Sequence, residues 1–582
     1  MGLGEESDMD NVPLIEQAYA KDALVSDKKS SKWDFLILTV PFFSLQLAWI
    51  IQQVFGIPYL SSLGITDAQI PLFVVSGPVA GIIVPPIVAA LSETSHGPLG
   101  RRKPFIFAGG CGTILSFLLL AAAEPISVTL SYSFLGTGSN RATMTGTHLI
   151  AGISIYALNF SIQPLALGLR ASVVDHFAPA EQAQANLWIS YFSSLGSIFV
   201  TLVGLAYSPD FRILSIVVSG FIAVMLAIVA MRKNTSPLDC ADVLRKQTQS
   251  TAYRHFIGLL NRVRHLPPIT QWTCQVQLVS WFAWFFILNY TSVLVSRIYQ
   301  MPETTTTSAQ RAPGKMAAGV ALLFHSSSLI SLIFASAVWG GTSSVTTPVH
   351  YKDGGNTEEQ ATVKDTGSEK EKEEEEEVTQ RDRAKLYSGP RDEPGSLAGS
   401  DLHLRRNILA RRVWKPALLC LAASVIVITI LVAIAPQAST IITATSILLG
   451  ANGALFGLSN WVPHSLIAHE ASIRARTQFM RKAKREQDTA FKLSDSSDDS
   501  SDFGDERGDG VTDMWGGDGE EDIADETPVL LAVHNMAITV PQVVAAVISW
   551  LLMNTLDAMG IQQNIWWIYA MSVPAALWAA CL

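Results

Sequence analysis

One apolar segment of the chain carries a set of polar side chains with helical spacing. The stretch LNFSIQPLALGLRASVVDH, residues 158–176, contains Asn159, Gln163, Arg170 and Asp175. At about 100° per residue, Asn159, Gln163 and Arg170 fall on one face of a helix, and Asp175 falls on the opposite face. A guanidinium fork can bind paired hydroxyl groups or a carboxylate, and amides can hydrogen-bond hydroxyls. We therefore expect Asn159, Gln163 and Arg170 to line a polar path, with Asp175 pointing toward a cytoplasmic gate.

The alternative for Arg170 is a side chain that extends to the lipid headgroups at the end of its helix. A second polar group lies in the first apolar run, where Gln46 and Gln53 share a helix face and Trp49 is nearby. Two amides for hydroxyl groups and an indole for an apolar face make a candidate site for a ligand rich in hydroxyls. A packed polar interface between helices explains the same pattern equally well.

The composition places these residues in a membrane. Only 16% of the 582 residues are charged and 49% are hydrophobic, with a mean hydropathy of +0.30, which excludes an ordinary soluble protein. Twelve apolar runs are long enough to cross a bilayer. The expected spans are 33–56, 68–91, 104–123, 148–171, 183–207, 213–231, 270–294, 316–339, 413–435, 439–468, 528–553 and 564–582. The predicted fold class is therefore an all-α integral membrane protein with twelve transmembrane helices.

Basic residues are concentrated in alternate loops, which places both termini in the cytoplasm by the positive-inside rule. A polar N-terminus of about thirty residues precedes the first apolar run, so no cleavable signal peptide is expected. The last expected span ends at Leu582, the final residue, which leaves open whether the C-terminus is complete. The five cysteines have neither pairing nor metal-ligand spacing, so no metal or cofactor is expected. No nucleic-acid partner is expected either.

A basic loop at 232–269 divides the expected spans into two six-helix halves, 33–231 and 270–582, after a cytoplasmic tail at 1–32. This organisation resembles the major facilitator superfamily, in which substrate lies near the midplane between the halves. Two acidic, aromatic-poor loops, 340–412 and 474–526, are expected to be disordered. Serines among aspartates in the second loop suit an acidophilic kinase, although a solvated linker is the more usual interpretation.

The loop LSETSHGPLGRRKPF, residues 91–105, contains a charge cluster. We expect Glu93 to pair with Arg101 or Arg102, or to lie near a helix N-terminus of the other half. Together with Asp175, these residues would then bias the inward- and outward-facing states. A role in setting the membrane topology alone explains part of the same pattern.

This loop resembles the S-D-x(6)-G-R-R-R-P-F-I motif of sucrose transporters. Further similar segments are QLAWIIQQVFGIPYLSSLGI (46–65), LNFSIQ (158–163), SWFAWFFIL (280–288), GLSNWVPHSLIA (457–468) and HNMAITVPQ (534–542). By their order and spacing, the chain resembles the glycoside–pentoside–hexuronide:cation symporter family, in its sucrose/maltose branch and with the long acidic loops of fungal members. The resemblance implies transport of a disaccharide such as sucrose, maltose or a related alpha-glucoside by alternating access, coupled to protons. It also implies a plasma-membrane location, with the vacuolar membrane as the alternative.

The resemblance also shows one departure. The family has an aspartate at the position of Asn159, where the carboxylate is the expected proton carrier, and an asparagine cannot titrate. An uncoupled facilitator and a sugar receptor without net transport therefore remain alternatives. No catalytic motif points to an enzyme. The histidines in or near spans are expected to be packing residues, and His464, which replaces a phenylalanine of the family, is the most unusual of them.

Overall fold

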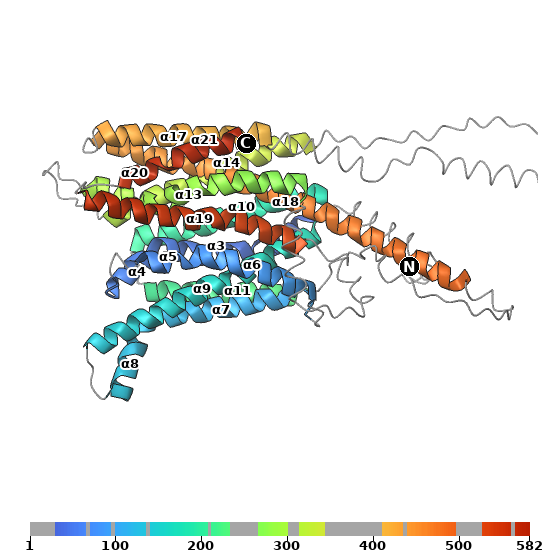
Figure 1. Ribbon diagram of the computed structural model, residues 1–582, viewed down its shortest axis with the longest axis horizontal. Coiled ribbons are helices and arrows are strands. Elements are labelled where there is room, and N and C mark those ends of the chain that lie inside the picture. The colour runs from blue at the N-terminus through green and yellow to red at the C-terminus, as the bar shows by residue number, and fades with distance from the viewer. Residues whose placement is uncertain are drawn as a thin grey trace, which may run out of the picture.

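The computed structural model describes eleven segments of the chain. They are residues 30–65, 70–94, 99–135, 140–207, 211–232, 266–300, 313–343, 410–434, 439–495, 527–559 and 565–582. Most of the two expected acidic loops, and therefore the proposed kinase site, lie outside these residues. Within them the chain is helical, with the helices running side by side in one elongated body (Figure 1).

The first half of the chain begins with a broken helix. Its elements are α2 (Lys32–Thr39), α3 (Pro41–Ile51), the π-helical turn η2 (Gln52–Gly56), α4 (Ile57–Ser62), α5 (Ile70–Val74), α6 (Ser76–Thr94), α7 (Lys103–Ala121), α8 (Ala123–Leu135), α9 (Asn140–His176), the 3₁₀ turn η3 (Pro179–Glu181), α10 (Gln182–Tyr207) and α11 (Phe211–Met231). The second half has α13 (Pro268–Gln300), α14 (Pro313–Ser343), the π-helical turn η5 (Ala410–Trp414), α17 (Lys415–Ile434), α18 (Ser439–Asp495), α19 (Thr527–Ala558), α20 (Ile565–Ala570) and α21 (Ser572–Cys581).

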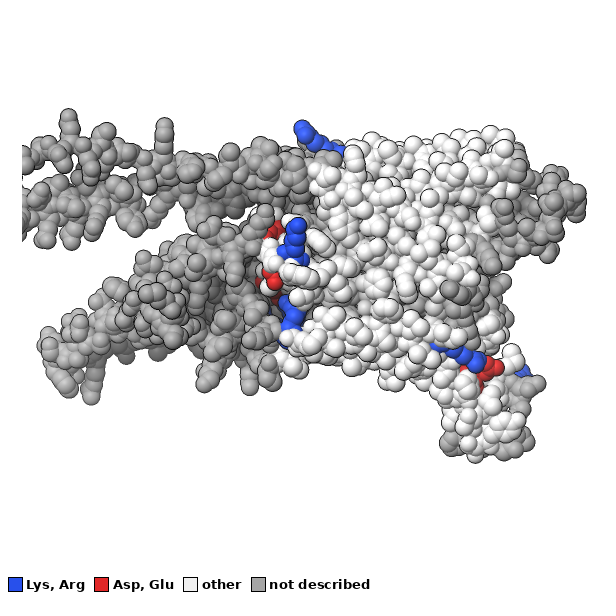
Figure 2. All heavy atoms as spheres, turned by 180° about the vertical axis from the view of Figure 1, so that it is seen from behind, with Lys and Arg blue, Asp and Glu red and all other residues white. Residues whose placement is uncertain are grey.

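Ten helical segments of the described chain are long and apolar enough to cross a membrane, and they coincide with ten of the twelve expected spans. The seventh expected span is α13, a helix of 33 residues whose several glutamines lower its hydropathy. The twelfth is divided between α20 and α21. Charged side chains gather at the two ends of the body, and the face between them in Figure 2 carries none. The predicted class, an all-α multi-pass membrane protein, is confirmed.

The structure differs from the expected elements at several places, including both ends of the expected loop 340–412, where α14 runs to Ser343 and η5 begins at Ala410. The first span is interrupted at η2, where the helical hydrogen-bond register changes. An additional helix, α8, extends away from the body beside the start of α9 (Figure 1). Finally, α18 continues as a helix to Asp495, so the part of the 474–526 segment from 474 to 495 is helical and not an irregular loop. This part is rich in alanine, lysine, arginine and glutamine, which have high helix propensity.

Each half has its own apolar core, and a third cluster joins the two. The first core gathers residues mainly of α2, α3, α7, α9, α10 and α11. The second gathers residues mainly of α13, α14, α17, α18 and α21, together with Leu187 of α10 from the first half. The third cluster combines Val88 and Leu167 of the first half with Ile467 and Leu530 of the second. The halves therefore pack together through this third cluster, near the end of the body where α6 and α9 finish, and through α10, which contributes to the second core.

The same carboxylate cap occurs once in each half. Glu181 accepts hydrogen bonds from the backbone N and the Oγ of Ser30, at 2.9 and 2.6 Å. Glu470 accepts from the backbone N and the Oγ1 of Thr270, also at 2.9 and 2.6 Å. A carboxylate at a helix N-terminus satisfies amide groups that lack an intrahelical partner. In the first half, the residue just before α2 is thus held by a side chain of η3. In the second half, the start of α13 is held by a side chain of α18.

Helices α14 and α18 approach closely because small residues lie between them. Ser327 Oγ donates to the Gly450 carbonyl at 2.7 Å, and Ser331 Oγ donates to the Ala454 carbonyl at 3.0 Å. A Cβ atom added to Gly453 would clash with the backbone carbonyl of Phe324. Close approach over small residues is the usual basis of helix association in membranes.

We therefore expect Gly453→Ala to lower the free energy of unfolding by about 1–3 kcal/mol, the usual effect of overpacking. The matched control is Gly319→Ala in α14, where an added Cβ meets nothing within 4 Å. Thermal unfolding of the purified variants in detergent measures the difference. Equal melting temperatures for the two variants would contradict the close α14–α18 contact.

Candidate functional site

A polar cavity lies between the two halves. Its wall is built from α3, η2, α6, α9 and α10 on one side and from α13, α14, α18 and α19 on the other. Its volume is about 190 Å³, well above the roughly 10–15 Å³ that a cavity needs to hold one water molecule. Its polar side chains are Gln46, Gln53, Gln163, Arg170, Asn186, Ser190, Ser193, Ser194, Ser197, His325, Ser328, Asn460, His464, His534 and Asn535. Among the described residues, no aspartate or glutamate lines this cavity.

Five of the six residues expected to bind substrate lie in this wall: Gln46, Trp49, Gln53, Gln163 and Arg170. Gln46 Nε2 donates to Ser197 Oγ at 3.1 Å, which fixes the amide next to α10. Gln53 belongs to η2, and π-helical turns in other proteins often coincide with functional sites. The structure therefore brings the two polar groups of the sequence, in α3–η2 and in α9, to one cavity.

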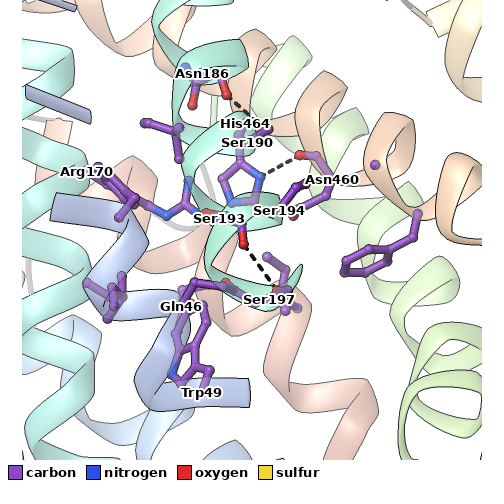
Figure 3. A pocket seen from close by; sticks show the side chains of 18 of the residues that line it. Gln46, Trp49, Arg170, Asn186, Ser190, Ser193, Ser194, Ser197, Asn460 and His464 are labelled. Atoms are coloured by element: carbon purple, nitrogen blue, oxygen red, sulfur yellow. Dashed lines mark hydrogen bonds between the residues drawn. The ribbon is translucent and has the colours of Figure 1, made fainter. Parts of the chain in front are cut away.

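Arg170 points into the cavity and not along its helix toward the lipid. Figure 3 shows its side chain extending from α9 toward the centre, where His464 and the α10 serines lie. Its Cζ atom lies 5.7 Å from the centroid of the Phe42 ring, a distance that allows a cation–π contact. The structure shows no carboxylate paired with it among the described residues. Its hydrogen-bond donors are consequently available to a ligand.

Asn159 differs from the expectation. Its side chain is 6% exposed and is absent from the cavity wall. Asn159 Nδ2 donates to Ser76 Oγ at 2.8 Å and to the Ile155 carbonyl at 3.0 Å, so the amide joins α9 to the start of α6. The helical angle alone placed Asn159 with Gln163 and Arg170. In the structure, α6 packs over Asn159 and separates it from the cavity. The position of a residue around its own helix does not predict which other helix will cover it.

The sequence interpretation missed the contribution of α10. Asn186, Ser190, Ser193, Ser194 and Ser197 all face the cavity from this helix (Figure 3). They recur at intervals of three and four residues in NLWISYFSSLGS, the spacing of one helix face. A polar stripe in an apolar span was therefore present in the sequence.

The second half contributes amides and histidines that were also not assigned to the path. Asn535 Nδ2 donates to the Gly81 carbonyl at 2.9 Å and contacts Gln163 Oε1 at 3.4 Å, so it bridges the two halves. His464 Nδ1 lies 2.7 Å from the Asn460 carbonyl, and its ring meets the His534 ring edge to face, with centroids 4.7 Å apart. These contacts depend on how the halves dock, which a pattern within one helix does not encode.

The expected gating residues are placed at the end of the body where the halves meet. Arg102 binds Asp175 through two bonds, Nε to Oδ2 at 2.7 Å and Nη2 to Oδ1 at 3.3 Å, and both side chains are less than a tenth exposed. Arg102 Nη1 also donates to Ser92 Oγ at 2.7 Å. Arg101 is buried beside this pair, whereas the side chain of Glu93 lies outside the described residues. Asp175 therefore points away from the cavity, and its arginine partner comes from the loop before α7.

This ion pair supports the turn between α9 and α10, which contacts the second half directly. Ser472 Oγ donates to the Phe177 carbonyl at 3.2 Å, and Trp461 Nε1 donates to the Ala183 carbonyl at 3.0 Å. His469 Nδ1 lies 2.5 Å from the Pro179 carbonyl. The cavity is thus closed at this end by α18 packed against the α9–α10 turn.

The described helices thus form a multi-pass membrane body with a polar cavity between its two halves. Comparison with known sequences relates the chain to sugar transporters. It is 26% identical over 308 residues to the general alpha-glucoside permease of Schizosaccharomyces pombe, covering 51% of this chain and 54% of that protein. It is 26% identical over 289 residues to the sucrose transport protein SUT5 of rice (Oryza sativa subsp. indica), covering 46% of this chain and 53% of that protein.

These relatives confirm the resemblance predicted from the motifs, and they are named as a permease and a transport protein, not as enzymes. The chain spans about half the length of the curated relatives it matches. No family model matches the sequence. Among solved structures, the E. coli fucose:proton symporter aligns with a TM-score of 0.49 at 11% identity, covering 95% of this chain and 99% of that one. A D-xylose–proton symporter aligns with a TM-score of 0.49 at 12% identity, covering 94% and 97%.

Proposed function

We propose that this protein is a secondary transporter of a disaccharide such as sucrose, maltose or a related alpha-glucoside, coupled to protons and working by alternating access. The observation that carries the proposal is the cavity between the halves, where Gln46, Gln53, Gln163 and Arg170 surround a space also lined by Trp49. Amides and a guanidinium match sugar hydroxyls, and an indole matches the apolar face of a sugar ring. The names of the relatives, an alpha-glucoside permease and a sucrose transport protein, agree with this chemistry.

The absence of carboxylates from the described cavity wall supports a substrate that is not a cation. A fixed carboxylate would favour a positively charged solute, whereas hydroxyl, amide and guanidinium groups bind neutral polyols through hydrogen bonds. The closed end at the α9–α10 turn is then one of the two gates that alternating access requires. We place this gate and both termini on the cytoplasmic side, as the distribution of basic loop residues predicts. The plasma membrane is the proposed location.

The experiment is uptake of radiolabelled maltose and sucrose into cells that lack their own disaccharide transporters, between about pH 5 and pH 8, with and without a protonophore. Proton-coupled transport gives uptake that rises as the external pH falls and collapses with the protonophore. Uptake that ignores both conditions would identify a facilitator. Sugar binding without flux would identify a receptor, and the absence of both would overturn the proposal.

An Asn159→Asp variant tests the role of the position at which the family carries an aspartate. Because Asn159 Nδ2 donates to Ser76 Oγ outside the cavity, an aspartate there replaces a donor by an acceptor at a buried contact between α6 and α9. We expect this variant to keep the sugar specificity of the wild type and to lower the amount of folded protein. A variant with higher proton dependence than the wild type would show that position 159 takes part in coupling.

A further inference from the structure

The cavity contains a pair of histidines that the sugar-binding role does not use. His464 of α18 and His534 of α19 lie in edge-to-face contact, with ring centroids 4.7 Å apart and an interplanar angle of 76°. Both rings line the cavity, although His534 is only 2% exposed. We propose that this histidine pair is the proton-binding site of the transporter, an inference that rests on the proposed function. The argument has three steps: which cavity groups can titrate, which nitrogen is basic, and what the bound proton changes.

The first step concerns the charged and titratable groups around the pair. Besides the pair, the charged or titratable side chains in the cavity wall are Arg170 of α9 and His325 of α14. The described wall residues of α3, α6, α10 and α13 include no charged or titratable side chain. The buried Glu470 further along α18 is bound to Thr270 and lies outside the wall. Since arginine stays protonated, the histidines are the groups of this wall whose ordinary titration falls between about pH 5 and pH 8. A proton that binds inside the cavity must therefore bind a histidine.

The second step identifies the basic nitrogens. His464 Nδ1 lies 2.7 Å from the Asn460 carbonyl, and a carbonyl oxygen only accepts, so Nδ1 carries the hydrogen. The lone pair of a neutral His464 ring is then on Nε2. His534 Nε2 is buried and has no hydrogen-bond partner among the described residues. Each ring of the contacting pair thus has an Nε2 atom without a hydrogen-bond partner among the described residues. We infer that the pair can bind one proton at these nitrogens.

His325 lacks this arrangement. Its ring packs edge to face on Phe324, the preceding residue of its own helix, and within the described part of the chain it makes no ring contact with a second titratable group. A small recess at the closed end of the cavity is lined by Arg170, His464 and His534 together, and His325 does not reach it. The pair, and not the third histidine, therefore lies where α9, α18 and α19 meet.

The third step is the consequence of protonation. Arg170 belongs to the first half, and both histidines belong to the second, so a proton on the pair places two positive charges across the contact between the halves. Like charges repel, and burial in the protein strengthens the repulsion, which favours separation of α9 from α18 and α19. A sugar hydroxyl oxygen between them can accept hydrogen bonds from the guanidinium and from the imidazolium, which lowers that repulsion. Proton and sugar binding then favour each other, as a symporter requires.

The test uses the purified full chain in proteoliposomes with radiolabelled maltose and sucrose. Two assays separate coupling from transport: accumulation driven by an inward proton gradient, and exchange of labelled for unlabelled sugar without a gradient. We expect His534→Gln and His464→Gln each to lose accumulation and sugar-induced proton movement while retaining exchange, because an amide hydrogen-bonds but does not titrate. Retained exchange also shows that the variant is folded. The control is His148→Gln. His148 lies outside the cavity and contacts the Leu63 carbonyl, so we expect this variant to keep both activities.

The outcomes distinguish this inference from the proposed function. Accumulation that survives in both variants would overturn the histidine pair as the proton site, as would loss of accumulation in His325→Gln with the pair intact. A wild type that exchanges sugar without moving protons would overturn the pair but leave sugar transport standing. A wild type that neither accumulates nor exchanges either sugar would overturn the proposed function itself, and this inference with it. Should one variant be unfolded, the other decides, since each removes one of the two rings.

Discussion

Replacing Arg170 by alanine is expected to reduce uptake of maltose or sucrose by roughly 10- to 150-fold, with the protein still present in the membrane. The estimate follows from a charge-assisted hydrogen bond, which is worth about 1.5–3 kcal/mol, and from about 1.4 kcal/mol per factor of ten. Arg170 extends into the cavity, where its described surroundings include the Phe42 ring but no carboxylate. Its donors are therefore directed at a ligand and not at a structural partner.

An Arg170→Lys variant separates the charge from the shape of the group. Lysine keeps the positive charge but loses the planar fork that binds two hydroxyl oxygens at once, so we expect uptake between that of the wild type and that of the alanine variant. The measurement is the initial rate of labelled-sugar uptake over a range of sugar concentrations, normalised to the amount of protein at the membrane.

The matched control is Arg212→Ala. Arg212 forms an ion pair with Glu124 at 2.6 Å, but the two side chains are 45% and 53% exposed, and neither faces the cavity. Its removal is expected to change uptake little, because exposed pairs contribute about 0–1 kcal/mol. Wild-type uptake rates and sugar affinity in Arg170→Ala would show that the guanidinium does not contact the substrate.

Breaking the Arg102–Asp175 pair is expected to produce the second large effect, this time on stability. Both side chains are less than a tenth exposed, and the carboxylate receives two bonds from the guanidinium. Removing one member of a buried pair leaves the other charge unpaired, at a cost of about 3–5 kcal/mol. We expect Asp175→Ala to lower the melting temperature of the protein in detergent and to loosen the α9–α10 turn at the closed end of the cavity.

A double-mutant cycle isolates the pair from the general effect of each substitution. Arg102→Ala, Asp175→Ala and the double variant are compared with the same set at Arg212 and Glu124, which is an ion pair of similar length on the surface. The double variant at the buried site is expected to be less destabilised than the sum of its single variants. A coupling energy as small as that of the surface pair would contradict a structural role for Asp175.

Much of the fold was predictable because lipid imposes simple rules on the chain. A span needs about twenty apolar residues, and ten of the expected spans satisfy that rule in the structure as well. The seventh expected span, 270–294, was predicted from its apolar run in the same way and corresponds to α13. The interruption at η2 and the length of α18 were not predicted, since both arise from backbone hydrogen bonding within an otherwise suitable sequence.

The candidate site was also predictable only in part. The helical period of a single segment predicted that Gln163 and Arg170 share a face, that Gln46 and Gln53 share another, and that Asp175 points away from Arg170. The same period was present in the serines of α10, where it was overlooked.

The sequence by itself determined the membrane class, the resemblance to sugar transporters and the polar face of each helix, because these depend on hydropathy, motifs and local periodicity. Only the tertiary structure decided which faces meet. It placed Asn159 against Ser76 and not in the cavity, and it joined Asp175 to Arg102. It also brought His464 and His534 together opposite Arg170. These contacts join helices distant in the chain, and their partners are set by how those helices pack, which no period within one helix specifies.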